Sequence, residues 1–125
     1  MLEVWEAALA APAWAGQPVW MHGDLHPANL LVEGQELSAV IDFGLLGVGD
    51  PACDLMVAWT YLSAESRDVF RSALAVDDAT WSRGRGWVVH IGLRAAAYSA
   101  DNPVLGDIGR YTLAEILAEF EQTRT

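Results

Sequence analysis

Hydrophobic residues recur at helical spacing near the start of the chain and again through its second half. The first stretch predicts an amphipathic helix over residues 2–11, ended by Pro12. Three short apolar runs follow, at residues 19–21, 29–32 and 37–41. Runs of this length predict strands rather than helices, and the four polar or glycine residues at 33–36 predict a hairpin between the last two.

From Asp54 onward the pattern is helical, and we expect four helices. They are one from Asp54 to about Leu62, one capped by Ser63 or Ser66, a long one capped by Asp77 or Asp78 and ended at Asn102-Pro103, and one from about Thr112 to Gln122. The long helix should turn Tyr98 inward, and Gly84 and Gly86 should weaken its first turns. The predicted fold is therefore a single α+β unit, predominantly α, over residues 1–125.

Composition narrows the classes of protein that fit this pattern. Hydrophobic residues make up 53% of the chain, which is enough for a folded core. The net charge is −10, with seven arginines and no lysine, so the basic patch of a nucleic-acid-binding protein is missing. An acidic surface favours cationic substrates and metal ions, although it also serves solubility.

The single cysteine and the absence of long apolar runs indicate where in the cell the protein is expected. Cys53 has no partner for an intrachain disulfide and fits a reducing cytosol, so we expect a cytoplasmic protein. No run reaches the roughly 18 apolar residues of a membrane span, and the first 15 residues lack the basic start of a signal peptide.

Asp24, Asn29 and Asp42 are the residues most suited to chemistry. Each is expected in a loop or at a strand end beside apolar sequence, where a carboxylate needs a partner, a metal or a catalytic role. The loop containing Pro27 can turn Asp24 and Asn29 towards one point, and the hairpin brings Asp42 alongside. Two carboxylates and an amide are ligands that suit Mg²⁺. Capping and turn roles are the structural alternative.

Three segments in order carry a resemblance to kinases. Residues 22–29 match the H-x-D-x-x-x-x-N catalytic loop, and residues 41–44 match the D-F-G metal-binding segment. Residues 49–55 resemble the G-D-P-x-x-D-L segment of aminoglycoside phosphotransferases and their relatives, which include choline, homoserine and fructosamine kinases. The resemblance spans essentially the whole chain and implies the C-terminal lobe of a protein-kinase-like fold, with a small hairpin carrying the catalytic and metal-binding loops.

The resemblance implies a role for each matching residue. Asp24 would orient the acceptor hydroxyl and accept its proton, and Asn29 and Asp42 would bind Mg²⁺ together with the phosphates of ATP, with GTP as the alternative nucleotide. The implied reaction transfers a γ-phosphoryl group to an alcohol of a small, perhaps cationic molecule. Aminoglycoside antibiotics and several metabolites are candidate acceptors, and fold kinship does not choose among them.

Five further residues would support this site. His22 is expected to hold the loop from inside the core, and His26 to approach phosphate or metal or to remain a solvated loop histidine. Gly44 would supply a backbone conformation that a Cβ resists. Asp50 would cap the following helix or meet a substrate amine. Asp54 would accept backbone N–H groups of the catalytic loop.

The parts that hold the nucleotide in such kinases are not recognisable here. They include a glycine-rich phosphate-covering loop and a lysine that pairs with the phosphates. The chain has no lysine, and all seven arginines follow Asp42. We therefore expect the N-terminal lobe to be absent, the isolated chain to be weak or inactive, and the lobe-facing surface to meet the missing lobe or to drive self-association.

Two other functions compete with this interpretation. A metallophosphoesterase would explain the Asp-Leu-His order at residues 24–26, but the sequence has no Gly-Asn-His segment and offers only His90 as a later ligand. A non-catalytic half-kinase that binds or regulates would explain the missing lobe, although the intact trio of Asp24, Asn29 and Asp42 argues against it.

Overall fold

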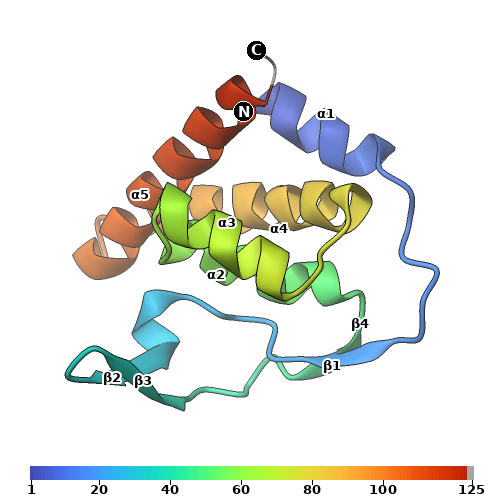
Figure 1. Ribbon diagram of the computed structural model, residues 1–125. Helices are drawn as coiled ribbons and strands as arrows, with labels where there is room; N and C mark the ends of the chain where they lie inside the picture. The colour runs from blue at the N-terminus through green and yellow to red at the C-terminus, as the bar shows by residue number, and fades with distance from the viewer. Residues whose placement is uncertain (124–125) are drawn as a thin grey trace.

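The computed structural model describes residues 1–123 and has a helical layer above a lower layer of short strands and loops (Figure 1). In chain order the elements are α1 (Leu2–Ala10), β1 (Val19–Met21), the 3-10 helix η1 (Pro27–Asn29), β2 (Leu30–Glu33), β3 (Glu36–Val40), β4 (Gly47–Gly49), the 3-10 helix η2 (Pro51–Met56), α2 (Val57–Thr60), α3 (Ala64–Ala73), α4 (Asp78–Ala97) and α5 (Pro103–Gln122). The predicted mixed and mostly helical fold is confirmed. Within residues 1–123, no helix has the length and apolar character needed to cross a membrane.

The lower layer contains two separate antiparallel pairs of strands. The hairpin β2–β3 is present as predicted, with Leu30 opposite Val40 and Glu33 opposite Glu36. The second pair joins β1 to β4, with Met21 opposite Gly47, and β4 is not among the strands predicted from the sequence. Because β1 runs directly into the loop at residues 22–29, this pairing sets where that loop begins.

The helical layer is centred on α4, which packs against α5, α1 and η2. Its buried core includes the large side chains of Trp59, Trp81 and Met56. Gly84 and Gly86 lie where α4 meets its neighbours: a Cβ at Gly86 would lie 2.7 Å from the Cβ of Ala8. The two glycines were expected to weaken α4, but they allow α1 and η2 to approach it closely.

Three expectations about the helices are corrected by the structure. The last helix begins at Pro103 instead of Thr112, because a proline in the first turn needs no N–H partner and Asn102 Oδ1 accepts a bond from the Leu105 N–H at 3.2 Å. Tyr98 is 54% exposed, since it lies at the C-terminal cap of α4. Residues 54–62 form no single helix, because the chain passes from η2 into the four-residue α2.

For α3 and for α4, the first of the two predicted capping residues forms the cap. Ser63 Oγ accepts a hydrogen bond from the Ser66 N–H at 3.3 Å, and Asp77 Oδ1 accepts one from the Thr80 N–H at 2.7 Å. The Thr80 bonds also hold the pKa of Asp77 below its usual value, because they stabilise the ionised carboxylate.

Glu119 joins three helices at the centre of the helical layer. Its carboxylate accepts hydrogen bonds from Trp59 Nε1 at 2.6 Å and Trp81 Nε1 at 2.8 Å, and it pairs with Arg85 Nε at 3.1 Å. Burial alone would raise the pKa of Glu119, but the bond and charge of Arg85, with the two indole donors, outweigh burial and lower it.

We expect Glu119→Gln to lower the free energy of unfolding by about 2–3 kcal/mol at neutral pH, because the amide places a donor among three donors. The lowered pKa stabilises the fold above the ordinary value of 4.5, and this contribution is lost as pH falls through the folded-state pKa. Denaturant unfolding at several pH values should therefore show the two proteins converging in acid. A difference that is independent of pH, or as large for the exposed Glu6→Gln control, would contradict this account.

The C-terminal end of α3 contains a strained alanine. Ala75 has φ of 50°, its N–H bonds to the Ser72 carbonyl, and the Val76 N–H bonds to the Arg71 carbonyl. This is the Schellman pattern, in which glycine is the usual residue at the position of Ala75.

Ala75→Gly should raise the free energy of unfolding by about 0.5–1 kcal/mol, because it relieves the left-handed strain. The matched control is Ala73→Gly, two residues earlier in the last turn of α3, which should lower it by a similar amount. Thermal unfolding of both variants checks the pair; two losses would show that Ala75 is not strained.

Candidate active site

Asp54 anchors the loop that follows β1. Its Oδ2 accepts a hydrogen bond from the His22 N–H at 2.7 Å, and its Oδ1 accepts one from the Gly23 N–H at 2.9 Å. From α2, the Thr60 hydroxyl donates to the Leu25 carbonyl at 3.3 Å. The contact that the resemblance implies for Asp54 is therefore present, and the helical layer holds the loop at two points.

Gly23 is the position in this loop that requires glycine. Its φ is 85°, and a Cβ there would lie 2.5 Å from the carbonyl oxygen of Leu45. Both the backbone conformation and the close approach of the neighbouring chain exclude a side chain. The loop can therefore lie directly against the segment that follows Asp42.

His22 links the loop to this second segment. The buried ring accepts a hydrogen bond from the Asp24 N–H at Nδ1 (3.2 Å) and, from Nε2, donates one to the Ile41 carbonyl at 2.8 Å. The ring also meets Phe43 edge-on, with 4.7 Å between ring centroids. His22 thus has the structural position that was expected for it.

Asp24 and Asn29 are brought together across the turn made by η1. The buried Asn29 donates from Nδ2 to the Asp24 carbonyl at 2.8 Å and to Asp24 Oδ2 at 3.1 Å. Its own carbonyl accepts a hydrogen bond from the Ile41 N–H at 3.0 Å. Both backbone polar groups of Ile41 are therefore bonded to the loop, which places Asp42 next to it.

Asp42 occupies a backbone conformation that is uncommon for a residue with a side chain. Its φ is 59°, and its exposed carboxylate accepts a hydrogen bond at Oδ1 from the Gly44 N–H at 3.3 Å. A non-glycine residue in the left-handed region is strained and persists there only where its surroundings hold it, and such residues gather at functional sites.

Gly44 was expected to supply a backbone conformation that a Cβ resists, and the structure shows that this reason is wrong. The backbone of Gly44 is not in the left-handed region, which is occupied by Asp42 and Gly23 instead. A Cβ at Gly44 would lie 3.2 Å from Asp42 Oδ1. Glycine at this position therefore makes room for the Asp42 carboxylate.

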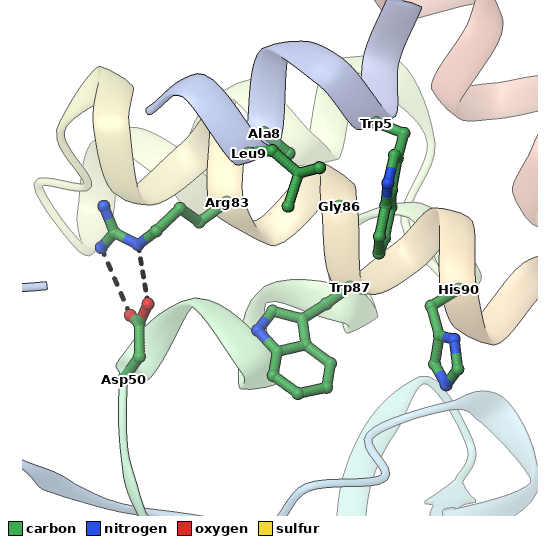
Figure 2. Close-up of a pocket in the computed structure, with 8 residues that line it drawn as sticks. All are labelled: Trp5, Ala8, Leu9, Asp50, Arg83, Gly86, Trp87 and His90. Atoms are coloured by element: carbon green, nitrogen blue, oxygen red, sulfur yellow. Dashed lines mark hydrogen bonds and ion pairs between the residues drawn. The ribbon is translucent and has the colours of Figure 1, made fainter. Parts of the chain in front are cut away.

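Asp50 caps η2, as the capping interpretation expected. Its Oδ1 accepts a hydrogen bond from the Ala52 N–H at 2.9 Å, and its Oδ2 pairs with Arg83 Nε at 2.7 Å (Figure 2). Both oxygens are engaged within the protein, so the geometry favours the cap over contact with a substrate amine. The pairing with Arg83, 33 residues away, has no signal in the sequence.

Two cavities lie near the loop 22–29 and η2, and they differ in whether a residue of the loop lines them. The pocket in Figure 2, of about 240 Å³, lies between α1 and α4 and includes Trp5, Trp87 and His90 in its lining, but no residue of the loop 22–29. A larger cavity of about 500 Å³ adjoins the loop through Leu25 and is also lined by Asp54. Of these two cavities, only the second is lined by a residue of the loop, and neither is lined by Asp24, Asn29 or Asp42.

Cys53 lies beside Asp54 but has no place in the chemistry. The thiol is buried, and burial, together with the charges of Asp54 and Asp50, raises the pKa of Cys53 to about 11. A thiol that stays protonated at neutral pH is a poor nucleophile.

The oxygen atoms near the loop decide whether a divalent metal ion could bind there. Among residues 1–123, no group of three or more His, Cys, Asp or Glu side chains has an arrangement that holds a metal ion. The available donors are the amide oxygen of Asn29 and the carboxylate of Asp42. Mg²⁺ commonly takes one or two protein ligands and completes its shell with phosphate oxygens and water, so this donor set fits nucleotide-bound Mg²⁺.

Comparison with known families agrees with this geometry. The model of the phosphotransferase enzyme family (APH) matches residues 1–87, which include all the loops described above. The chain belongs to the phosphotransferase enzyme family. Comparisons with curated proteins and with solved structures return no match. Membership indicates a kinase-type phosphotransferase, and in this family it generally implies ATP and a divalent metal.

Asp54→Asn should destabilise the fold by about 1–3 kcal/mol, since an amide offers one acceptor oxygen to two backbone N–H donors and leaves one donor unpaired. Chemical unfolding measures this loss, with the exposed Asp68→Asn on α3 as the control. Equal stability of the two variants would show that Asp54 does not hold the loop.

Proposed function

We propose that this chain is the catalytic-loop lobe of a kinase that moves the γ-phosphoryl group of ATP to an alcohol of a small molecule. The observation that carries the proposal is the network that binds Asp24 to Asn29 and, through both backbone groups of Ile41, to the segment of Asp42. This network brings a carboxylate for the acceptor together with two oxygen ligands for a nucleotide-bound metal.

In this reaction Asp24 accepts the proton of the acceptor hydroxyl while the acceptor oxygen forms a bond to the γ-phosphorus. The bond from that phosphorus to the bridging oxygen breaks, and its electron pair leaves with ADP. A carboxylate is a weak base for an alcohol, so the main contribution of Asp24 is to orient the hydroxyl. Asn29 and Asp42 would hold Mg²⁺, which when bound supplies charge neutralisation on the phosphates.

The parts that cover the phosphates must come from another lobe, because the 125 residues contain no lysine. Large apolar side chains exposed around the loops support a covering partner. They are Trp20, Phe43, Leu45, Leu46 and Val48, each more than half exposed. We propose that the nucleotide-binding lobe covers this face, with self-association as the alternative that sedimentation at high concentration would reveal.

The net charge of the chain indicates which class of acceptor it would attract. The net charge of −10 attracts cations, which favours an acceptor with an amine or ammonium group beside its hydroxyl. No observation favours a metallophosphoesterase: His90 is on α4 and lines the pocket between α1 and α4, whose lining includes no residue of the loop 22–29. A non-catalytic half-kinase remains the second candidate, favoured by the missing lysine.

We expect wild-type chain with Mg²⁺-ATP and amino-alcohol acceptors to form ADP and a phosphate ester only slowly, because the lobe that covers the phosphates is missing, and ³¹P NMR over long incubations measures this weak transfer. Asp24→Asn should slow this transfer by about 10²–10⁴-fold while leaving Mg²⁺-ATP binding intact. Asp42→Asn should weaken that binding about 10- to 100-fold, because it removes a charged ligand. Calorimetry measures the binding.

Asp68→Asn is the matched control and should change neither transfer nor binding. Binding that depends on Asp42 without any transfer would favour the half-kinase. Transfer that survives Asp24→Asn, or binding that is equal in wild type and Asp42→Asn, would refute the assigned roles.

A further inference from the structure

His26, which was expected to approach phosphate or metal or to remain a solvated loop histidine, lies beside Asp24 in the candidate site. It precedes η1, and its side chain is only 13% exposed. Nδ1 of the ring accepts a hydrogen bond from the Ala28 N–H at 3.3 Å, and Nε2 lies 3.4 Å from Asp24 Oδ2. The ring therefore touches both the backbone of the turn and the catalytic carboxylate.

The contact at Nδ1 determines where the ring carries its hydrogen. A nitrogen that accepts a hydrogen bond presents its lone pair, so the neutral ring of His26 has its N–H at Nε2. Asp24 Oδ2 lies 3.4 Å from this nitrogen, at the distance of an electrostatic contact. Nδ2 of Asn29, which is also a donor, lies 3.4 Å from His26 Nε2 and 3.1 Å from the same oxygen. Both hydrogens of Asn29 Nδ2 are donated to Asp24, one to its carbonyl and one to Oδ2, so with the ring hydrogen at Nε2 the contact between Asn29 and His26 joins two donors that lie beside the same oxygen.

The two oxygens of Asp24 are thus placed in different environments. Oδ2 faces donors from Asn29 and His26, whereas within residues 1–123 Oδ1 receives no hydrogen bond. We infer that His26 is a positioning residue for Asp24: it holds Oδ2 together with Asn29 and leaves Oδ1 as the oxygen that meets the acceptor hydroxyl. This inference rests on the proposed function for its chemical meaning, but its geometric content can be tested without the reaction.

Two substitutions separate this role from a purely structural one. The amide of asparagine reaches the position of Nδ1, so His26→Asn keeps an acceptor for the Ala28 N–H but cannot reach Asp24. The amide of glutamine reaches the position of Nε2, so His26→Gln keeps a donor for Oδ2 and gives up the cap. A residue that only caps η1 would tolerate asparagine better, whereas a positioning residue would tolerate glutamine better.

The test is NMR of the 125-residue chain without nucleotide or acceptor, so its failure is distinct from a failure of the proposed function. In the wild type, ¹⁵N shifts of the His26 ring should show the hydrogen at Nε2. Three-bond couplings to the Asp24 β-protons should show one side-chain rotamer in wild type and in His26→Gln, and averaged rotamers in His26→Asn. Dispersed amide spectra establish that both variants fold.

A hydrogen at Nδ1 in the wild type would overturn the inference. So would a single Asp24 rotamer that persists in His26→Asn, or averaging in His26→Gln or in the wild type itself. In the active enzyme, His26→Asn should lower kcat by about tenfold with KM for the acceptor little changed, and His26→Gln should restore most of that loss.

Discussion

The two hydrogen bonds from the loop backbone to Asp54 are the contacts on which the candidate site depends. They connect the loop at residues 22–29 to the helical layer, whose core includes the buried Trp59 and Trp81. Asp54 lies in η2, and η2 is packed against α4, where Gly84 lets Leu55 approach closely. The loop is therefore positioned by its backbone bonds to the helical layer, and its own sequence supplies a glycine that can take a φ of 85°.

From this anchor, a series of short polar contacts extends to the chemistry. His22 is fixed by Asp54 and in turn bonds to the Ile41 carbonyl, while Asn29 holds Asp24 and accepts the Ile41 N–H. Each contact places the next residue within narrow limits, and Asp42 is held in a strained conformation at the end of the series. Such strain persists only where the surroundings determine the backbone, which is what the bonds on both sides of Ile41 provide.

Much of the site could be predicted from sequence because its signals are local. The spacing of Asp24, Asn29 and Asp42, the hairpin and two of the helix caps all follow from residues close together in the chain. β4 could not be predicted, since Gly-Val-Gly has no alternating pattern and its pairing with β1 is made across the fold. The role of Gly44 was assigned to the wrong physical cause, because sequence does not show whether a glycine serves its own backbone or the carboxylate of Asp42 beside it.

Hydrogen exchange of the His22 and Gly23 amides tests the central claim most directly, because these are the donors to Asp54. If the helical layer preforms the loop, both amides should exchange as slowly as buried amides of α4, through global unfolding alone. Exchange as fast as that of the exposed turn at Gly34 would contradict the account, because the loop would then open independently of the core.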